Sequence, residues 1–347
     1  MAAENEDVLV TVDNGVGVLT LNRPKAINSL NDVMVAGIAN ALNDWENDGS
    51  VHTVMLTGAG ERGLCAGGDV IAIYHDAPVG GAETRAFWHD EYVLNARIAR
   101  YRKPYVAVMD GIVMGGGVGI SAHASTRVVT DTTKVGMPEV GIGFIPDVGG
   151  TYLLARAPGR LGLHAALTGA PFSGADAIAM GFADHFVPHY ALAAFKQAVV
   201  TDGVDAALAA HETEPPASPL LAQRHWIDEC FAGETVPDIL AELRGHDAGP
   251  ANDAANLIAT RSPIALAVAL TAVRRAADLD SLEDVLRQEY RTSCAALRSH
   301  DFVEGIRALL IDKDRNPQWS PSTLTLCGTE EVEAYFAPAD PDLTFPE

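Results

Sequence analysis

Patterns that bind metal ions or form disulfide frameworks are missing from this chain of 347 residues. Its four cysteines are scattered without CxxC spacing, so neither a zinc ribbon nor a disulfide framework is expected. The eleven histidines include no HExxH pair, and Pro188 interrupts the one pair at helical spacing, His185 and His189. We therefore expect no metal site.

Positive charge and long apolar runs are also scarce. The chain has 24 Lys and Arg against 46 Asp and Glu, a formal net charge of -22, which disfavours nucleic acid and anionic membranes as partners. No run approaches the ~18 apolar residues of a membrane span. The N-terminal segment MAAENED is acidic and has neither an Arg-rich amphipathic stretch nor a hydrophobic signal core, so a cytoplasmic location is expected.

Three common ligand-binding or catalytic motifs are absent. No GxxxxGK[ST] phosphate loop, dinucleotide-binding GxGxxG in its βαβ context, or GxSxG nucleophile elbow occurs. Nucleotide cofactors and a serine nucleophile are therefore not expected. What the chain does have is 48% hydrophobic residues, enough for a large core in one or two domains.

The hydrophobic pattern alternates between strands and helices. Strands are expected at 8–13 and 16–21, joined by a tight Asn14-Gly15 turn, and at 51–56, 105–109 and 127–129. Helices are expected after Ser29 or Asn31, near Asp69, over 83–101, from the glycines at 115–117 towards 124, and over much of 147–200 and 226–300. The Pro-rich stretch 214–221 indicates a linker or an insertion. This alternation predicts an α/β fold.

Two glycine-rich segments precede expected helices: CAGGDV at 65–70 and MGGGVG at 114–119. Glycines there can simply permit tight turns or close packing. Alternatively, exposed backbone N–H groups at a helix N-terminus can hold an anion or a developing oxyanion.

Four ordered segments resemble the crotonase superfamily: LNRPKAINSLN at 21–31, CAGGDV, KPYVAVMDGIVMGGGVG at 103–119 and MPEVGIGFIPDVGG at 137–150. The tail at 289–319, EYRTSCAALRSHDFVEGIRALLIDKDRNPQW, is similar to the 3-hydroxyisobutyryl-CoA hydrolases of that superfamily. The resemblance implies a spiral of ββα turns over 1–200 with the acyl-CoA site, and a helical region over 201–347 that covers it. It also implies trimers or paired trimers as a possible homo-oligomer.

The resemblance further implies where a thioester carbonyl would bind. In the family, one backbone N–H from each glycine segment polarises that carbonyl, and the matching positions are Gly68 and Gly116. Coenzyme A would be part of the substrate, with no separate cofactor. In the family, adenine is bound by backbone at positions matching Ala26 and Ala66, so these positions are weak CoA candidates together with the neighbouring cation Lys25. Arg23, Arg62, Lys313 and Arg315 are further cations near these segments or in the tail.

The carboxylates separate hydrolysis from hydration. Hydratases of the family use two glutamates; here Glu139 matches one, whereas Gly119 occupies the position of the other. Asp147 stands where hydratases typically have glycine. We therefore predict that Glu139 acts on the carbonyl as nucleophile or as base for water, and that Asp147 binds the substrate hydroxyl or handles a proton.

Other roles are open for these acids. Asp147 could cap the following helix, and Glu91, which matches a substrate-side carboxylate of the hydrolases, could lie exposed on an amphipathic helix. The predicted activity is hydrolysis of 3-hydroxyisobutyryl-CoA, a step of valine degradation. The alternatives are an enoyl-CoA hydratase or isomerase, and a catalytically silent acyl-CoA-binding scaffold.

Overall fold

The computed structural model describes residues 7–346, and the chain forms two compact units. Unit 1 comprises Met1–Gly68, Leu94–Val135 and Phe172–Ser218; unit 2 comprises Asp69–Val93, Gly136–Pro171 and Pro219–Glu347. The segment MAAENED lies outside the described residues except for Asp7. Each unit is made of segments from several parts of the sequence, so the two units differ from the predicted division of the chain at residue 200. That division stays a prediction.

A hairpin begins unit 1. Strands β1 (Val8–Asp13) and β2 (Val16–Leu21) pair antiparallel, with Val8 opposite Leu21. Asn14 and Gly15 between them have φ values of 45° and 81°, the left-handed conformation that a two-residue hairpin turn requires. Both strands and the turn confirm the sequence prediction.

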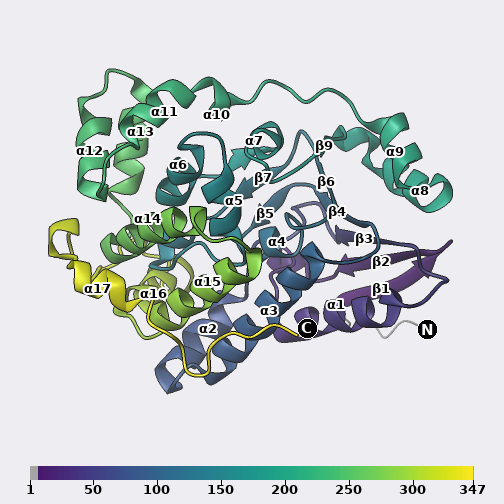
Figure 1. The fold of residues 1–347 in the computed structure, drawn as a ribbon, viewed down its shortest axis with the longest axis horizontal. Helices are drawn as coiled ribbons and strands as arrows, with labels where there is room; N and C mark the ends of the chain where they lie inside the picture. The colour runs from purple at the N-terminus through teal and green to yellow at the C-terminus, as the bar shows by residue number, and fades with distance from the viewer. Residues whose placement is uncertain (1–6, 347) are drawn as a thin grey trace. The chain divides into compact units, whose positions relative to one another are not determined.

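The main sheet of unit 1 continues from this hairpin in the order β1-β2-β3-β4-β6-β9 (Figure 1). All pairs from β2 onward are parallel. The later strands are β3 (Thr53–Gly58), β4 (Tyr105–Met109), β6 (Thr126–Val129) and β9 (His185–Phe186). Helical connections between parallel strands confirm the predicted α/β class.

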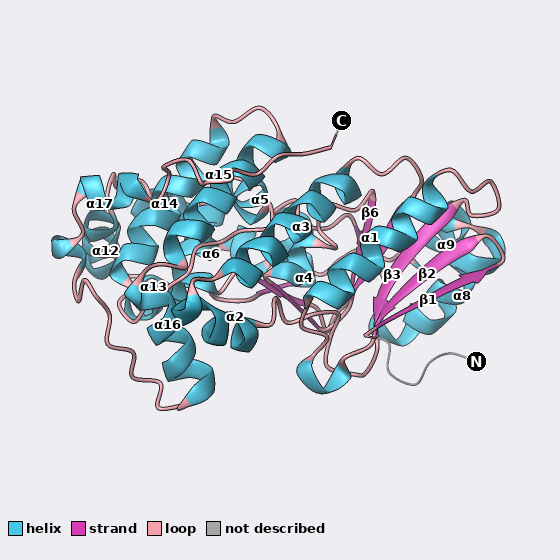
Figure 2. Cartoon of the chain, turned by 90° about the horizontal axis from the view of Figure 1, so that it is seen from below, coloured by secondary structure: helices cyan, strands magenta, loops and turns pink. Residues whose placement is uncertain are grey.

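Helices cover both faces of this sheet (Figure 2). Helix α1 (Asp32–Glu46) starts at Asn31, whose side chain accepts the N–H of Met34 at 2.9 Å, and its Trp45 packs directly over Gly17 of β2. On the other face, α8 (Leu192–Asp202) and α9 (Val204–His211) pack on Val16 and its neighbours in the parallel strands. Successive residues of β2 point to opposite faces of the sheet, so Val16 contacts one helical layer and Gly17 contacts the other.

A smaller sheet in unit 1 has the order β5-β7-β8. Its strands are β5 (Ile112–Met114), β7 (Lys134–Gly136) and β8 (Phe172–Ser173). The following helices are short: α4 (Gly116–Gly119) and α7 (Gly174–Ala179). We expected α4 to continue towards residue 124; it ends after one turn because three of its four residues are glycines, which are poor helix formers.

Unit 2 is built mainly from helices. Before residue 172 these are α2 (Val70–Asp76), the first part of α3 (Ala82–Ala99), the 3-10 turn η3 (Glu139–Ile142), α5 (Gly150–Arg156) and α6 (Leu161–Thr168). After residue 218 they are α10 (Pro219–Ala222), α11 (Arg224–Cys230), α12 (Val236–Gly245), α13 (Gly249–Ile258), α14 (Pro263–Ala277), α15 (Leu282–Ala296), α16 (His300–Ile306) and α17 (Thr329–Ala334). The unit boundary falls inside α3, after Val93.

Helix α14 lies at the centre of unit 2. It contacts α5, α6, α12, α15 and α17, and ten of its residues are buried. Elsewhere in the unit, Trp88, Phe144 and Phe302 stack with ring centroids 4.5–6.2 Å apart. These rings join α3, the loop after η3 and α16.

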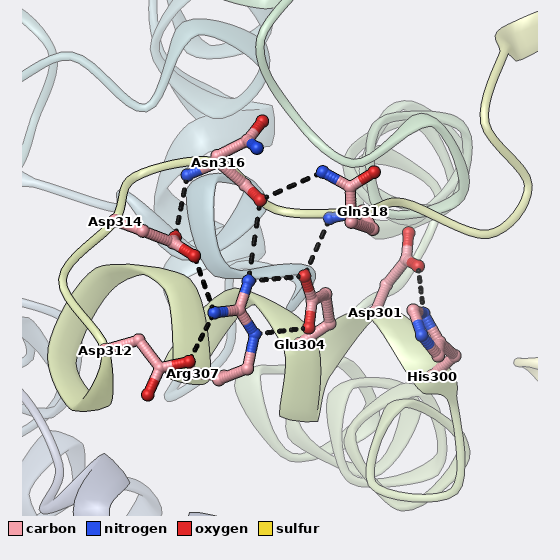
Figure 3. A network of polar contacts seen from close by, with 8 residues as sticks. All are labelled: His300, Asp301, Glu304, Arg307, Asp312, Asp314, Asn316 and Gln318. Atoms are coloured by element: carbon pink, nitrogen blue, oxygen red, sulfur yellow. Dashed lines mark hydrogen bonds and ion pairs between the residues drawn. The ribbon is translucent and has the colours of Figure 1, made fainter.

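Arg307 is the centre of a polar network in the loop that follows α16 (Figure 3). The Arg307 guanidinium donates to Glu304 at 2.8 Å, to Asp312 at 2.6 Å and to Asp314 at 2.7 Å. These bonds close the loop in which Lys313 and Arg315 adopt left-handed φ values of 58° and 54°. Both of these cations are exposed.

Within the described residues, no single helix is long and apolar enough to cross a membrane. Only the pair Gly249–Ile258 and Pro263–Ala277, taken together across a bend of 114°, reaches the length and composition of a span.

Candidate active site

Glu139 begins the 3-10 turn η3, directly after Pro138. Its side chain is buried, and its Oε2 has no hydrogen-bond partner among the residues described. Gly143, with φ of 72°, ends the turn by donating its N–H to the Glu139 carbonyl. A buried carboxyl oxygen without a partner is costly, so this atom is available to a substrate group or a water molecule.

Helix α16 of the tail fixes this turn from the outside. A Cβ on Gly305 would collide with the Ile142 carbonyl, and a Cβ on Gly143 would collide with the Asp301 carbonyl. The two backbones therefore approach more closely than any side chain would allow. The tail segment that resembles the hydrolases thus supports the turn that carries Glu139.

Asp147 lies in the loop before α5, in the same unit. It is only 5% exposed, and its Oδ2 accepts the phenolic O–H of Tyr92 at 2.6 Å. The Tyr92 oxygen lies 2.9 Å from the Ser293 hydroxyl of α15. Asp147 does not cap α5 with its side chain, because the residue at the cap position is Gly149.

Glu91 precedes Tyr92 on α3 and is also buried, at 2% exposure. Its Oε1 has no hydrogen-bond partner in the described chain. The alternative of an exposed carboxylate on an amphipathic helix is therefore wrong. A second buried oxygen is available to a ligand hydroxyl.

A fourth buried acid, Glu289 of α15, completes the group. Its two oxygens accept the Gly149 N–H at 2.6 Å, the Thr151 N–H at 2.8 Å and the Thr151 hydroxyl at 2.6 Å. Unlike Glu91 and Glu139, Glu289 has donors on both oxygens.

Burial raises the pKa of all four acids. Burial raises the pKa of Asp147 to about 7 and the pKa of Glu289 to about 8. The hydrogen bond from Tyr92 acts in the opposite direction and lowers the pKa of Asp147. Burial, followed by the charge of Asp147, raises the pKa values of Glu91 and Glu139 well above their usual range. Because the charge of Asp147 helps to raise the pKa of Glu139, ionisation of one of these acids disfavours ionisation of the other. Such a pair contains one acid and one base.

The two glycine segments lie next to each other in unit 1. Cys65 bridges to Val113, and a Cβ on Gly117 would lie 2.7 Å from the Cys65 carbonyl. Gly116 starts helix α4, so its N–H has no carbonyl partner within the helix. In the described part of the chain, the backbone N–H groups of Gly68 and Gly116 donate no hydrogen bond to backbone carbonyls.

The predicted CoA segments also meet in unit 1. The Ala66 N–H donates to the Ile27 carbonyl at 2.9 Å, beside Lys25 and Ala26 in the turn Pro24–Ala26. Lys25 and Ala26 are exposed, whereas Ala66 is half-buried. The Ala26 carbonyl accepts the Ser29 N–H at 3.2 Å. Adenine binding by these residues stays a prediction.

The histidine pair has other partners. His185 contacts Glu212 at 2.9 Å, and His189 contacts Asp110 at 2.9 Å. Over residues 7–346, no group of three or more His, Cys, Asp or Glu residues is arranged to hold a metal ion.

Sequence reasoning missed Tyr92, Glu289 and Ser293. Tyr92 directly follows the predicted Glu91, and the other two lie four residues apart on α15, within the tail quoted for its resemblance. That spacing places both on one helix face, a signal that was available. Their partner on the Asp147 loop was not visible from the sequence.

Comparison with known proteins gives a consistent family. The enoyl-CoA hydratase/isomerase model matches residues 16–336. The chain is 39% identical over 345 residues to the mitochondrial 3-hydroxyisobutyryl-CoA hydrolase of Danio rerio, covering 96% of this chain and 90% of that protein. The human protein of the same name is 36% identical over 342 residues, covering 95% and 88%.

Solved structures carry different names. A carnitinyl-CoA dehydratase from Mycobacterium thermoresistibile is 71% identical, with a TM-score of 0.96 over 98% of this chain and 99% of that one. An enoyl-CoA hydratase from Rhodobacter sphaeroides is 41% identical, with a TM-score of 0.93 over 98% and 100%. These structures confirm the crotonase-like fold that the sequence predicted.

The buried acids make stability depend on pH. Their pKa values in the folded chain exceed the ordinary 3.8 of Asp and 4.5 of Glu, so the folded state binds more protons than the unfolded state above those values. Their stabilisation is therefore complete at low pH and is lost as pH rises through about 7 for Asp147 and about 8 for Glu289. Asp110 and Asp184, whose pKa values are lowered, act oppositely at more acidic pH. Burial lowers the pKa of His164 to about 4, so this one group opposes the four acids up to about pH 6.5.

We expect the melting temperature to fall between about pH 5 and pH 9, and Glu139→Gln to reduce this fall and to melt higher than wild type at the alkaline end. Calorimetry across that range measures both effects. Asp90→Asn, at an exposed acid of α3, is the control and should leave the slope unchanged. A melting temperature that rises steadily over this range would contradict the burial argument.

Tyr92→Phe removes the hydrogen bond that favours the charged form of Asp147. The pKa of Asp147 should therefore rise above about 7. Carboxyl ¹³C NMR of aspartate-labelled protein measures this titration, with the Asp147→Asn spectrum identifying the resonance. Tyr290→Phe is the control, because the Tyr290 hydroxyl donates to the Arg85 carbonyl and not to Asp147. This substitution should leave the pKa of Asp147 unchanged. An unaltered titration in Tyr92→Phe would show that the bond has no such effect.

Proposed function

Because the chain belongs to the enoyl-CoA hydratase/isomerase family, we propose that it hydrolyses the thioester of a short 3-hydroxyacyl-CoA, namely 3-hydroxyisobutyryl-CoA. The observation that carries this proposal is the burial of both Glu139 and Asp147 in unit 2, where Glu139 Oε2 has no hydrogen-bond partner among the described residues and Asp147 accepts the Tyr92 hydroxyl. Relatives that carry the hydrolase name match nearly the whole chain, tail included.

The missing second glutamate supports hydrolysis over hydration. Gly119, at the end of α4, occupies the position where hydratases of the family carry a glutamate. Glycine has no group that could donate or accept a proton, so a glutamate pair cannot add water across a double bond in the usual way. The second acid of this chain is Asp147 instead.

The reaction assigns separate tasks to the two sets of groups. The N–H groups of Gly68 and Gly116 would stabilise the oxyanion that forms on the thioester carbonyl, with each donor worth on the order of 3 kcal/mol. Glu139 would attack that carbonyl or activate the water that does. For either route Glu139 must lose its proton, which its raised pKa opposes, and we propose that the ionised form of Asp147 accepts it.

The proton then has a defined use. The C–S bond breaks, the water oxygen ends on the acyl carbon, and the departing thiolate takes a proton from Asp147. The buried oxygens of Glu91 and Glu139 that have no partner among the described residues are available to the substrate hydroxyl and the attacking water. Coenzyme A leaves as product, which makes it part of the substrate.

A second candidate is reversible dehydration of a 3-hydroxyacyl-CoA. The specific observation in its favour is the 71% identity to the carnitinyl-CoA dehydratase. This reaction needs a proton to leave the acyl chain and a hydroxyl group to depart, and the same pair of acids could serve both steps.

The two reactions differ in their products. We expect release of free thiol from 3-hydroxyisobutyryl-CoA, measured with a thiol reagent, and little change in enoyl absorbance with carnitinyl-CoA or crotonyl-CoA. Glu139→Gln and Asp147→Asn should each lower turnover by at least about 100-fold while remaining folded. The control Asp90→Asn should keep full activity.

Rapid hydration or dehydration without thiol release would favour the second candidate and sink the hydrolase proposal. Tight binding of acyl-CoA without turnover of any substrate would indicate a silent scaffold.

Location and assembly complete the proposal. We propose a cytoplasmic protein of the valine degradation pathway, supported by similarity to proteins from two bacteria. The vertebrate relatives are named mitochondrial. A trimer or hexamer is proposed from the family, and light scattering after gel filtration would show a monomer if that is wrong.

A further inference from the structure

The loop that carries Asp147 has an unfavourable backbone. Val148 has φ of 54° and Gly149 has φ of 77°, so two successive residues adopt the left-handed conformation. Glycine accepts this conformation readily, but a β-branched side chain such as valine rarely does. Val148 is also buried, at 1% exposure. Such a conformation persists only where surrounding contacts impose it.

Glu289 supplies those contacts. Its carboxylate accepts the N–H groups on both sides of Gly150, from Gly149 at 2.6 Å and from Thr151 at 2.8 Å. The Thr151 hydroxyl adds a third bond at 2.6 Å. Helix α5 has no side-chain cap of its own at Gly149, so Glu289 provides the cap from a distant part of the sequence.

Helix α15 also contacts the group that holds the side chain of Asp147. Ser293, one turn after Glu289 on α15, contacts the Tyr92 hydroxyl that donates to the Asp147 carboxylate. Glu289 thus fixes the backbone just after Asp147, while Ser293 and Tyr92 fix its side chain. Two independent routes from one helix determine where this carboxylate lies.

We propose that Glu289 is a positioning residue, whose buried carboxyl group holds Val148 and Gly149 in the left-handed conformation and thereby fixes Asp147 for proton transfer. The expected effect of Glu289 on turnover rests on the proposed function, whereas its effect on the loop does not. Glu289 needs no contact with the substrate, since it acts through the backbone of residues 149 and 151.

A carboxyl group, charged or protonated, suits this task better than the amide of the same shape, because both of its oxygens can accept a hydrogen bond. All three groups facing Glu289 are donors in the structure. In Glu289→Gln, the amide oxygen can still accept from one side, but the NH₂ group then faces an N–H donor. The substitution therefore removes the clamp while keeping the volume of the side chain.

Amide hydrogen exchange tests the clamp without any substrate. In Glu289→Gln, exchange at Gly149 and Thr151 should accelerate by at least about tenfold, while amides in the middle of α14 keep their wild-type rates. Thr151→Val removes only the hydroxyl bond and should give a smaller acceleration. Unchanged rates at Gly149 and Thr151, or a uniform acceleration across unit 2, would overturn the proposal.

Kinetics tests the consequence for Asp147. Glu289→Gln should lower kcat for thioester hydrolysis by about 100-fold and change KM by less than about threefold, as expected when a reacting group is displaced. Glu283→Gln, the same chemical change on the same helix, is the matched control and should leave kcat and both exchange rates unchanged.

A wild-type kcat in Glu289→Gln would overturn the positioning role even if exchange accelerates. If the wild-type protein releases no thiol from any substrate, the proposed function fails, whereas the exchange rates still decide whether Glu289 clamps the loop.

Discussion

Burial of carboxyl groups without cations is the constraint on which unit 2 depends. No lysine or arginine is among the groups that shift the pKa values of Glu91, Glu139, Asp147 and Glu289. Only hydroxyl and backbone donors stabilise charge on these groups, and two of the oxygens have no donor within the described chain. Such an arrangement lowers stability, so it persists only where packing holds each group in place. The close backbone contact of α16 with η3 is part of that packing.

Much of the fold was predictable because local signals agreed with the final packing. Strands β1, β2 and β4 have the bounds that the hydrophobic pattern predicts, and Asn31 caps α1. β3 begins two residues later than expected. The hydrophobic pattern identifies buried residues such as Val51, whereas the bounds of a strand depend on its backbone hydrogen bonds to the neighbouring strand. α4 is shorter than expected. The motif predicts a helix after the glycines, but glycine has a low helix propensity, so the two local signals disagree.

The candidate site divides along a similar line. Glu91, Glu139 and Asp147 were identified from motifs, which act through local sequence. Tyr92 and Ser293 meet across 201 positions, and Gly149 and Glu289 across 140. No periodicity or spacing encodes such pairs, and a single sequence contains no signal of contact between them. The candidate catalytic acids were therefore accessible to sequence reasoning, whereas the residues that hold them in place were not.

The distance along the chain between Gly149 and Glu289 also sets an order of events during synthesis. At about 5–20 residues per second, the ribosome needs about 7 to 28 s to extend the chain from the Asp147 loop to α15. During that interval Val148 has no carboxylate to hold its left-handed conformation. The nascent chain thus carries both candidate catalytic acids in an unlocked state, and their geometry matures only when the last fifth of the protein is made.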